Sequence, residues 1–142
     1  MPAEAIGEAL SVPGVQTAYN QIKQANFNVT LSRGAQPDWV PDGTALKGFT
    51  NPSTGEVTIW LRNLESPDDL IATLVHESSH TTTILRRGVV DPDGVQAAEY
   101  AADLRAWIVT NGRKPTVNER NDILVDTINR ISETGLYDVI QI

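Results

Sequence analysis

The chain has 142 residues, of which 40% are hydrophobic and 20% charged, and its net charge is −7 at pH 7. This length suits one domain with its own core, so we expect a single domain over residues 1–142. The acidic balance argues against a nucleic-acid partner, because phosphates are bound by clustered Lys and Arg. The chain has no cysteine, which excludes disulfides, thiolate metal sites and cysteine nucleophiles.

The N-terminal segment "MPAEAIGEAL" lacks the basic stretch and apolar run of a secretory signal. No apolar run along the chain approaches the ~18 residues that a membrane-spanning helix requires. We therefore expect no membrane association. The expected location is either cytoplasmic or exported as part of a longer polypeptide.

The first half of the chain predicts helical segments followed by a small sheet. After an opening helical segment, residues 11–24 form a second one with Ser11 as N-cap, and residues 27–31 alternate like a half-buried strand. The segment "RGAQPDWVPDGTALKG" is rich in Pro, Gly and Asp and predicts a loop. Residues 46–50 and 56–61 flank the turn sequence "NPSTG" and predict a hairpin. The second helical segment has an apolar stripe of Val15, Ala18, Tyr19 and Ile22.

A long helix is expected after the hairpin. Ser66 is a good N-cap, Pro67 suits the first helical position, and Asp69 completes a capping box. The helix should run to about Arg87, because Gly88 is a typical C-terminal stop.

Two more helices complete the chain. One should begin at Asp93 and end near Thr110, and the next is signalled by the capping pair Thr116 and Glu119. The outline is an α+β domain, in which a small antiparallel or mixed sheet packs on a helical half. The buried stripe of the last helix should consist of Ile123, Leu124, Thr127, Ile128 and Ile131.

Both histidines of the chain fall in the long helix, in the sequence "LVHESSH". His76 and His80 are four residues apart, so they project from one helix face, where two imidazoles can share one tetrahedral ion. Glu77 lies close enough to take a proton from a water at such an ion. The alternative is a solvated polar face on an amphipathic helix.

A third metal ligand must be a carboxylate, because the chain has only two histidines. His80 lies seven residues before the expected helix end, and Glu99 lies six residues after the next expected start. In an antiparallel helical hairpin this count brings Glu99 level with His80, and Asp103 level with His76. We predict His76, His80 and Glu99 as metal ligands, with Asp103 accepting the other ring N–H of His76. An exposed acidic stripe is the alternative for the carboxylates, and Asp91 or Asp93 could compete with Glu99.

The two motifs together resemble the gluzincin branch of the zincin metallopeptidases. The sequence "HESSH", from His76 to His80, is followed after eighteen residues by "EYAADLRA", from Glu99 to Ala106. The second gluzincin motif is Glu-x-x-x-Asp, and the form Glu-x-x-Ala-Asp-x-x-Ala is similar to that of membrane stress peptidases and prenyl-protein proteases. The resemblance covers residues 56–110. It implies a minimal zincin-like core that binds Zn²⁺, with an active-site helix and an antiparallel glutamate helix.

Two roles known in related peptidases have no obvious residue in this chain. It lacks the third histidine of metzincins and the second-domain histidine that stabilises the transition state in thermolysin-like enzymes. A tyrosine or arginine would have to polarise the oxyanion, and we predict Tyr137 for this catalytic role, with Tyr100 and Arg105 as alternatives. In zincins the strand before the active-site helix is typically the sheet edge that binds substrate, so we expect an extended peptide along Glu56 to Trp60.

A compact metallopeptidase of this size is similar to the C-terminal peptidase toxin domains of bacterial polymorphic toxins. That resemblance implies a toxin or effector protease with a protein or peptide substrate and an inhibitor or immunity protein. The expected reaction is zinc-dependent endopeptidase hydrolysis with Glu77 as general base. Three alternatives stay open: a zinc-dependent hydrolase of non-peptide bonds, a catalytically silent binding module stabilised by metal, and a metal-free interaction protein.

Overall fold

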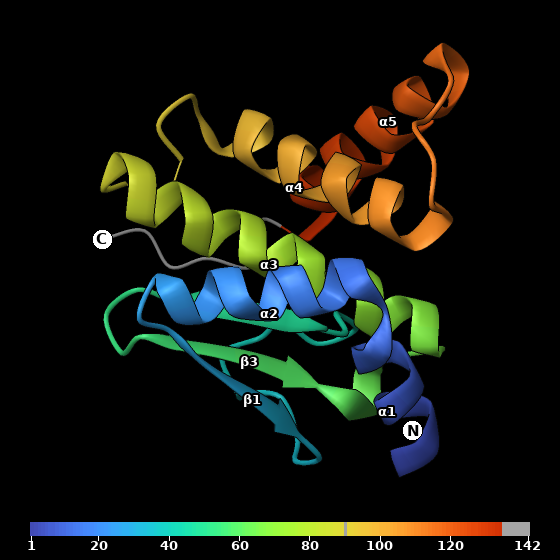
Figure 1. Ribbon diagram of the computed structural model, residues 1–142. Coiled ribbons are helices and arrows are strands. Elements are labelled where there is room, and N and C mark those ends of the chain that lie inside the picture. Colours follow the sequence, from blue (N-terminus) through green and yellow to red (C-terminus); the bar gives the residue numbers. More distant parts are fainter. Residues whose placement is uncertain (90, 135–142) are drawn as a thin grey trace.

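The computed structural model describes residues 1–89 and 91–134 and shows an α+β fold (Figure 1). This described part contains five α-helices and one three-stranded sheet, which confirms the predicted fold class. None of the described helices is both long enough and apolar enough to cross a bilayer. In chain order the elements are α1 (Ala3–Ser11), α2 (Pro13–Gln24), β1 (Asn28–Ser32), β2 (Gly48–Asn51), β3 (Glu56–Trp60), the 3-10 turn η1 (Leu61–Asn63), α3 (Pro67–Arg87), α4 (Val95–Asn111) and α5 (Val117–Thr134).

Strand β3 lies in the centre of the sheet, between β1 and β2. It runs parallel to β1, with Val57 opposite Val29, and antiparallel to β2, with Thr58 opposite Phe49. The predicted hairpin of β2 and β3 is therefore confirmed. The expectation that Glu56–Trp60 is the sheet edge is wrong, because β1 and β2 already pair with both sides of this strand. Within the described residues, β2 is an edge strand.

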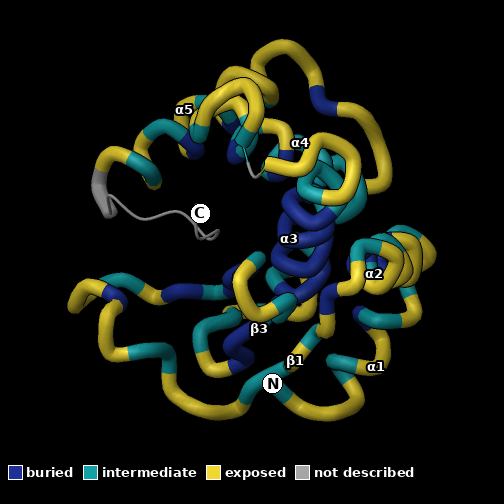
Figure 2. Tube along the Cα trace, turned by 90° about the vertical axis from the view of Figure 1, so that its left-hand side faces the viewer, coloured by how far each residue is buried: buried dark blue, intermediate teal, exposed yellow. Residues whose placement is uncertain are grey.

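Helix α3 is the centre of the molecule. It covers one face of the sheet together with α2, while α4 packs on α3 and α5 packs on α4 (Figure 1). Figure 2 shows that burial is concentrated along α3, with the exposed residues mostly on the surrounding elements. The middle of α3 therefore lies between the sheet and the α4–α5 pair. Fully buried core side chains come from α2, β3 and α3, namely Ile22, Val57, Ile59, Leu70 and Leu74.

The start of α3 matches the predicted capping box in part. Ser66 Oγ accepts a hydrogen bond from the backbone N–H of Asp69 at 3.2 Å, as expected for an N-cap. The Asp69 carboxylate, however, accepts hydrogen bonds from the backbone N–H of Glu65 at 2.8 Å and from Lys47 Nζ at 3.1 Å. The carboxylate thus ties the segment before β2 to the helix start.

The end of α3 and the start of α5 follow their sequence patterns. Gly88 ends α3 with a φ of 74°, in the left-handed region that glycine adopts without strain. Before α5, Thr116 Oγ1 accepts from the N–H of Glu119 at 3.2 Å, and Glu119 Oε1 accepts from the N–H of Thr116 at 3.0 Å. This reciprocal pair is the predicted capping box.

Two other helix starts differ from the prediction. Helix α4 begins at Val95 rather than Asp93, because residues 91–94 form a turn closed by a 3.0 Å backbone hydrogen bond. Ser11 does not cap α2. It is the last residue of α1, and its hydroxyl donates to the carbonyl of Glu8 at 2.7 Å.

Candidate metal centre

The pairing of α3 with α4 brings the two sequence motifs together in the predicted register. His80 Nε2 lies 3.2 Å from Glu99 Oε1, and His76 Nδ1 lies 2.8 Å from Asp103 Oδ1. Higher numbers on one helix face lower numbers on the other, so the helices are antiparallel. Ala102, on α4 next to Asp103, is fully buried, and its small side chain suits close packing of the helix.

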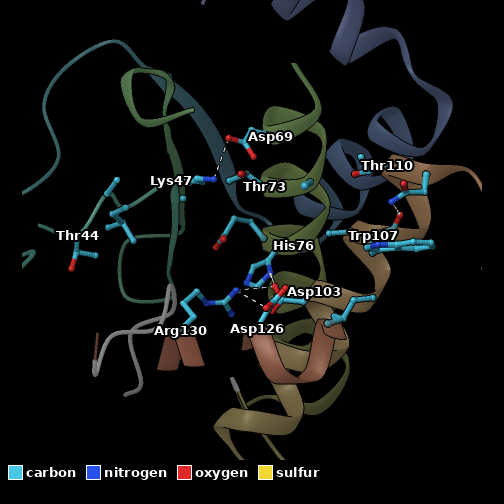
Figure 3. A pocket seen from close by; sticks show the side chains of 18 of the residues that line it. Thr44, Lys47, Asp69, Thr73, His76, Asp103, Trp107, Thr110, Asp126 and Arg130 are labelled. Carbon is cyan, nitrogen blue, oxygen red and sulfur yellow. Dashed lines mark hydrogen bonds and ion pairs between the residues drawn. The ribbon is translucent and has the colours of Figure 1, made fainter. Parts of the chain in front are cut away.

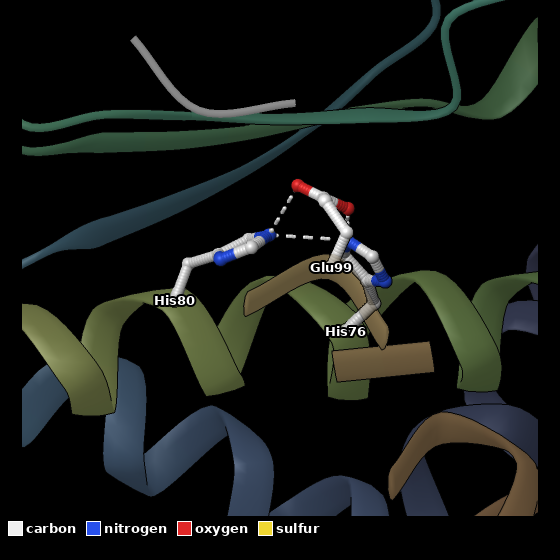
Figure 4. Close-up of side chains that lie close together, drawn as sticks. All are labelled: His76, His80 and Glu99. Atoms are coloured by element: carbon white, nitrogen blue, oxygen red, sulfur yellow. Dashed lines mark hydrogen bonds and ion pairs between the residues drawn. The ribbon is translucent and has the colours of Figure 1, made fainter. Parts of the chain in front are cut away.

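His76, His80 and Glu99 form one compact group of donor atoms (Figure 4). The two imidazole Nε2 atoms are 3.1 Å apart, and His76 Nε2 lies 3.0 Å from Glu99 Oε2. Ligand bonds of about 2.05 Å at tetrahedral angles would separate neighbouring ligand atoms by about 3.3 Å, close to these distances. Two nitrogens and one carboxylate oxygen are also the donor types that zinc prefers. The residues therefore fit a zinc ion.

The predicted ligands are buried instead of solvated. The side chains of His80 and Glu99 are only 3% and 2% exposed, and that of His76 is 9% exposed. An exposed polar helix face does not describe this arrangement, because these side chains are buried and contact one another.

Asp103 contacts the His76 ring through Nδ1. With Nδ1 donating to Asp103, the Nε2 atom of His76 faces Glu99 and His80. Burial raises the pKa of the Asp103 carboxyl, but the hydrogen bond and charge of His76 lower it. The charge of Arg130 and a hydrogen bond from Thr127 lower it further, and together they hold this pKa below its ordinary value of 3.8. Asp103 is therefore a stable anion beside the ring.

Arg130, on α5, is a site residue that the sequence patterns did not identify. Its Nη2 donates to Glu99 Oε2 at 2.8 Å, and its Nη1 donates to Asp103 Oδ2 at 2.9 Å. One turn earlier, Thr127 Oγ1 donates to Asp103 Oδ2 at 2.6 Å. The sequence feature that could have indicated this contact is Thr127, a polar residue within the otherwise apolar stripe of α5. Thr127 and Ile123 are buried there, and the other three stripe residues are partly buried.

Glu77 lies on the sheet side of α3 and is 1% exposed. Its Oε1 accepts a 2.7 Å hydrogen bond from Thr50 Oγ1, on β2. Gly48, on the same strand, borders the second oxygen, because a Cβ atom at this position would lie 3.2 Å from Oε2. Neither residue was identified from the sequence, because nothing local to the "HESSH" motif indicates which strand lies against it.

A cavity of about 620 Å³ opens beside His76 and Glu77 (Figure 3). One wall comes from β2 and the loop before it, and the other comes from α4 and α5. A cavity of this size accommodates several residues of an extended peptide or a drug-sized molecule. Its lining includes Thr44, Leu46, Lys47, Gly48, Asp69, Thr73, Asp103, Trp107, Thr110, Ile123, Asp126 and Arg130.

The loop wall of the cavity is anchored by one glutamine. Gln36 Oε1 accepts from the N–H of Leu46 at 2.9 Å and from Asn63 Nδ2 at 3.0 Å, while Gln36 Nε2 donates to the carbonyl of Thr44 at 2.8 Å. Asn63 Nδ2 also donates to the carbonyl of Leu46 at 2.7 Å. These bonds fasten the wall to η1, so this side of the cavity is preformed.

The other predicted residues lie elsewhere. Tyr137 lies outside the described residues. Arg105 bonds to Gln21 and, at 3.5 Å, to Ser79, so it belongs to the contact of α4 with α2 and α3. Neither Arg105 nor Tyr100 is among the described residues that line the cavity, and the described metal-ligand group does not include Asp91 or Asp93.

Comparison with known proteins assigns no family to the chain. No protein-family model matches it, and neither a curated protein nor a solved structure shows significant similarity. The functional argument therefore depends on the site itself.

Proposed function

We propose that this protein is a zinc-dependent endopeptidase of the gluzincin type, with His76, His80 and Glu99 as the zinc ligands. The observation that carries the proposal is the spacing of three buried donor atoms beside a buried glutamate at a large cavity. A bound zinc ion would supply a Lewis acid for a scissile carbonyl and would lower the pKa of water.

The chain's own residues divide the remaining work. Glu77 takes the proton of the attacking water and passes it to the leaving amine, which is the role of a general base and then acid. Asp103 holds the ring of His76, and Arg130 holds Glu99 and Asp103 in place. The arrangement thus separates ligand positioning, on the α4–α5 side, from proton transfer, on the sheet side.

Strand β2 takes over the substrate-binding role first expected of Glu56–Trp60. The N–H of Trp60 donates to the carbonyl of Lys47 at 2.9 Å, and residues of an antiparallel pair alternate between facing the partner strand and facing away. Gly48 and Thr50 therefore direct their N–H and C=O groups away from β3. A peptide can pair with these groups in extended form beside Glu77, and this supports a peptide substrate over a non-peptide one.

A catalytically silent module is less well supported than an enzyme. A silent module needs only the metal ligands. Glu77 is a further buried carboxylate, and its burial costs free energy that a role in catalysis would explain. The role as a bacterial toxin or effector, with an inhibitor or immunity protein, stays a prediction from the resemblance.

The test combines zinc content with peptide cleavage. Protein purified without chelators or metal-affinity steps should carry about one zinc per chain, and His80→Ala should lose it. With a peptide library read by mass spectrometry, the wild type should cleave, and Glu77→Gln should keep zinc but lose about a thousandfold in turnover. Glu8→Gln, an exposed carboxylate change on α1, serves as the matched control. Retained cleavage by Glu77→Gln, or wild-type protein without zinc, would contradict the proposal.

A further inference from the structure

The carboxylate of Glu77 is held from the edge strand of the sheet. Thr50 is fully buried, and its hydroxyl donates to Glu77 Oε1 over 2.7 Å. A hydrogen bond from a hydroxyl to a buried carboxylate is charge-assisted and roughly twice as strong as a neutral one. The terminal torsion of a glutamate is broad, so such a bond decides how the carboxylate is rotated.

Gly48 borders the other oxygen of the same carboxylate. A Cβ atom at this position would lie 3.2 Å from both Cγ and Oε2 of Glu77 and 2.7 Å from Cγ2 of Thr73. Gly48 and Thr50 are two residues apart on β2, so both face the same side of the sheet. Thr50 donates to one carboxylate oxygen, and Gly48 leaves room for the other oxygen.

We propose that Thr50 is a positioning residue that fixes the orientation of the Glu77 carboxylate, with Gly48 providing the space for its second oxygen. The role rests on the proposed function of Glu77 as the general base. Among residues 1–89 and 91–134, β2 is an edge strand, and the backbone groups of Gly48 and Thr50 point away from β3. The strand that would pair with the peptide is therefore the strand that orients the base. Binding and proton transfer are thereby built on one rigid element.

This geometry predicts a specific kinetic defect. Thr50→Val keeps the side-chain volume and removes the hydroxyl, so the backbone edge is unchanged while Glu77 loses the hydrogen bond from Thr50. We expect kcat to fall about tenfold with KM within twofold of wild type and zinc content unchanged. Thr50→Ser restores the hydroxyl and should recover kcat. Thr58→Val, on the neighbouring strand β3, controls for replacing a sheet threonine by valine.

A stability measurement tests the contact without turnover. Urea midpoints of wild type, Thr50→Val, Glu77→Ala and the double variant form a double-mutant cycle. We expect the midpoint shift caused by Thr50→Val to shrink when Glu77 is already alanine. If the shifts of the two single variants simply add in the double variant, Thr50 and Glu77 do not stabilise each other.

The outcomes separate the two proposals. A zinc-loaded wild type that cleaves no peptide would overturn the proposed function, and with it the positioning role of Thr50 in catalysis. An active wild type with an unchanged kcat in Thr50→Val, or a Thr50→Ser variant as slow as Thr50→Val, would overturn the positioning role alone.

Discussion

Two arginine–carboxylate clusters near α5 have similar contact distances and different surroundings. In the buried cluster, Arg130 contacts Glu99 and Asp103 at 2.8 and 2.9 Å, and these carboxylates are 2% and 18% exposed. In the exposed cluster, Arg113 makes two 2.8 Å bonds to Glu119, whose side chain is 32% exposed. The exposed cluster caps a helix and has a structural use. The buried cluster carries a desolvation penalty that stability alone does not explain, and this points to function.

The largest expected difference between the clusters concerns metal. If zinc binds beside the buried cluster, zinc at about a thousandfold above its dissociation constant stabilises the fold by about 4 kcal/mol. Calorimetry with and without a chelator should show this gain in the wild type and in Arg113→Met. Glu99→Gln should lose most of it, and an equal gain in Glu99→Gln would place the metal elsewhere.

The second-largest expected difference between the clusters is the loss of stability when each arginine is replaced. Arg130→Met removes a cation from buried Glu99 and partly buried Asp103 and should lower the free energy of unfolding of the metal-free protein by about 2 kcal/mol. Zinc should reduce that loss, because the ion supplies positive charge to the same carboxylates. Arg113→Met, in solvent, should change stability much less in urea titrations. Equal losses for the two variants would show that burial makes no difference.

The smallest effect is the pH dependence of the exposed cluster. The side-chain hydrogen bond from Arg113, together with the Thr116 backbone N–H, lowers the pKa of Glu119 from 4.5 to about 2. Because the folded-state pKa is the lower one, the stabilisation is complete above pH 4.5 and is lost as the pH falls toward 2. Thermal melts of Glu119→Gln should lie about 3 °C below wild type at pH 6 and converge with it on acidification. A gap that stays constant with pH would rule out this linkage.

The parts of the molecule that could be predicted from sequence depend on local spacing. The register that pairs His80 with Glu99, and His76 with Asp103, follows from counting residues along two consecutive helices with a short connection. The hairpin of β2 and β3 and the α5 capping box are equally local. In these cases the partners lie within one segment or on consecutive elements with a short connection, so few alternative arrangements compete.

The parts that could not be predicted depend on how distant elements pack. Whether β3 is central or at the edge depends on which side β1 pairs, and no residue in β3 encodes that choice. Thr50 and Glu77 are no farther apart in sequence than His76 and Asp103, but β3 lies between their elements in the chain, so counting residues does not pair them. Arg130 lies on the helix directly after that of Glu99, and no motif distinguishes it from the other polar residues of α5. The local sequence does not distinguish Thr50 or Arg130 from other strand or helix residues, because tertiary packing determines their contacts.

The placement of the proposed metal ligands on two consecutive helices has a consequence for how the site is assembled. Helices α3 and α4 are joined by a short connection, so their pairing alone brings the three donor atoms together. Thr50 reaches Glu77 from the sheet, and Arg130 reaches Glu99 from α5. The donor group thus needs only two elements, whereas the proposed base and the proposed carboxylate ligand are each held by a third.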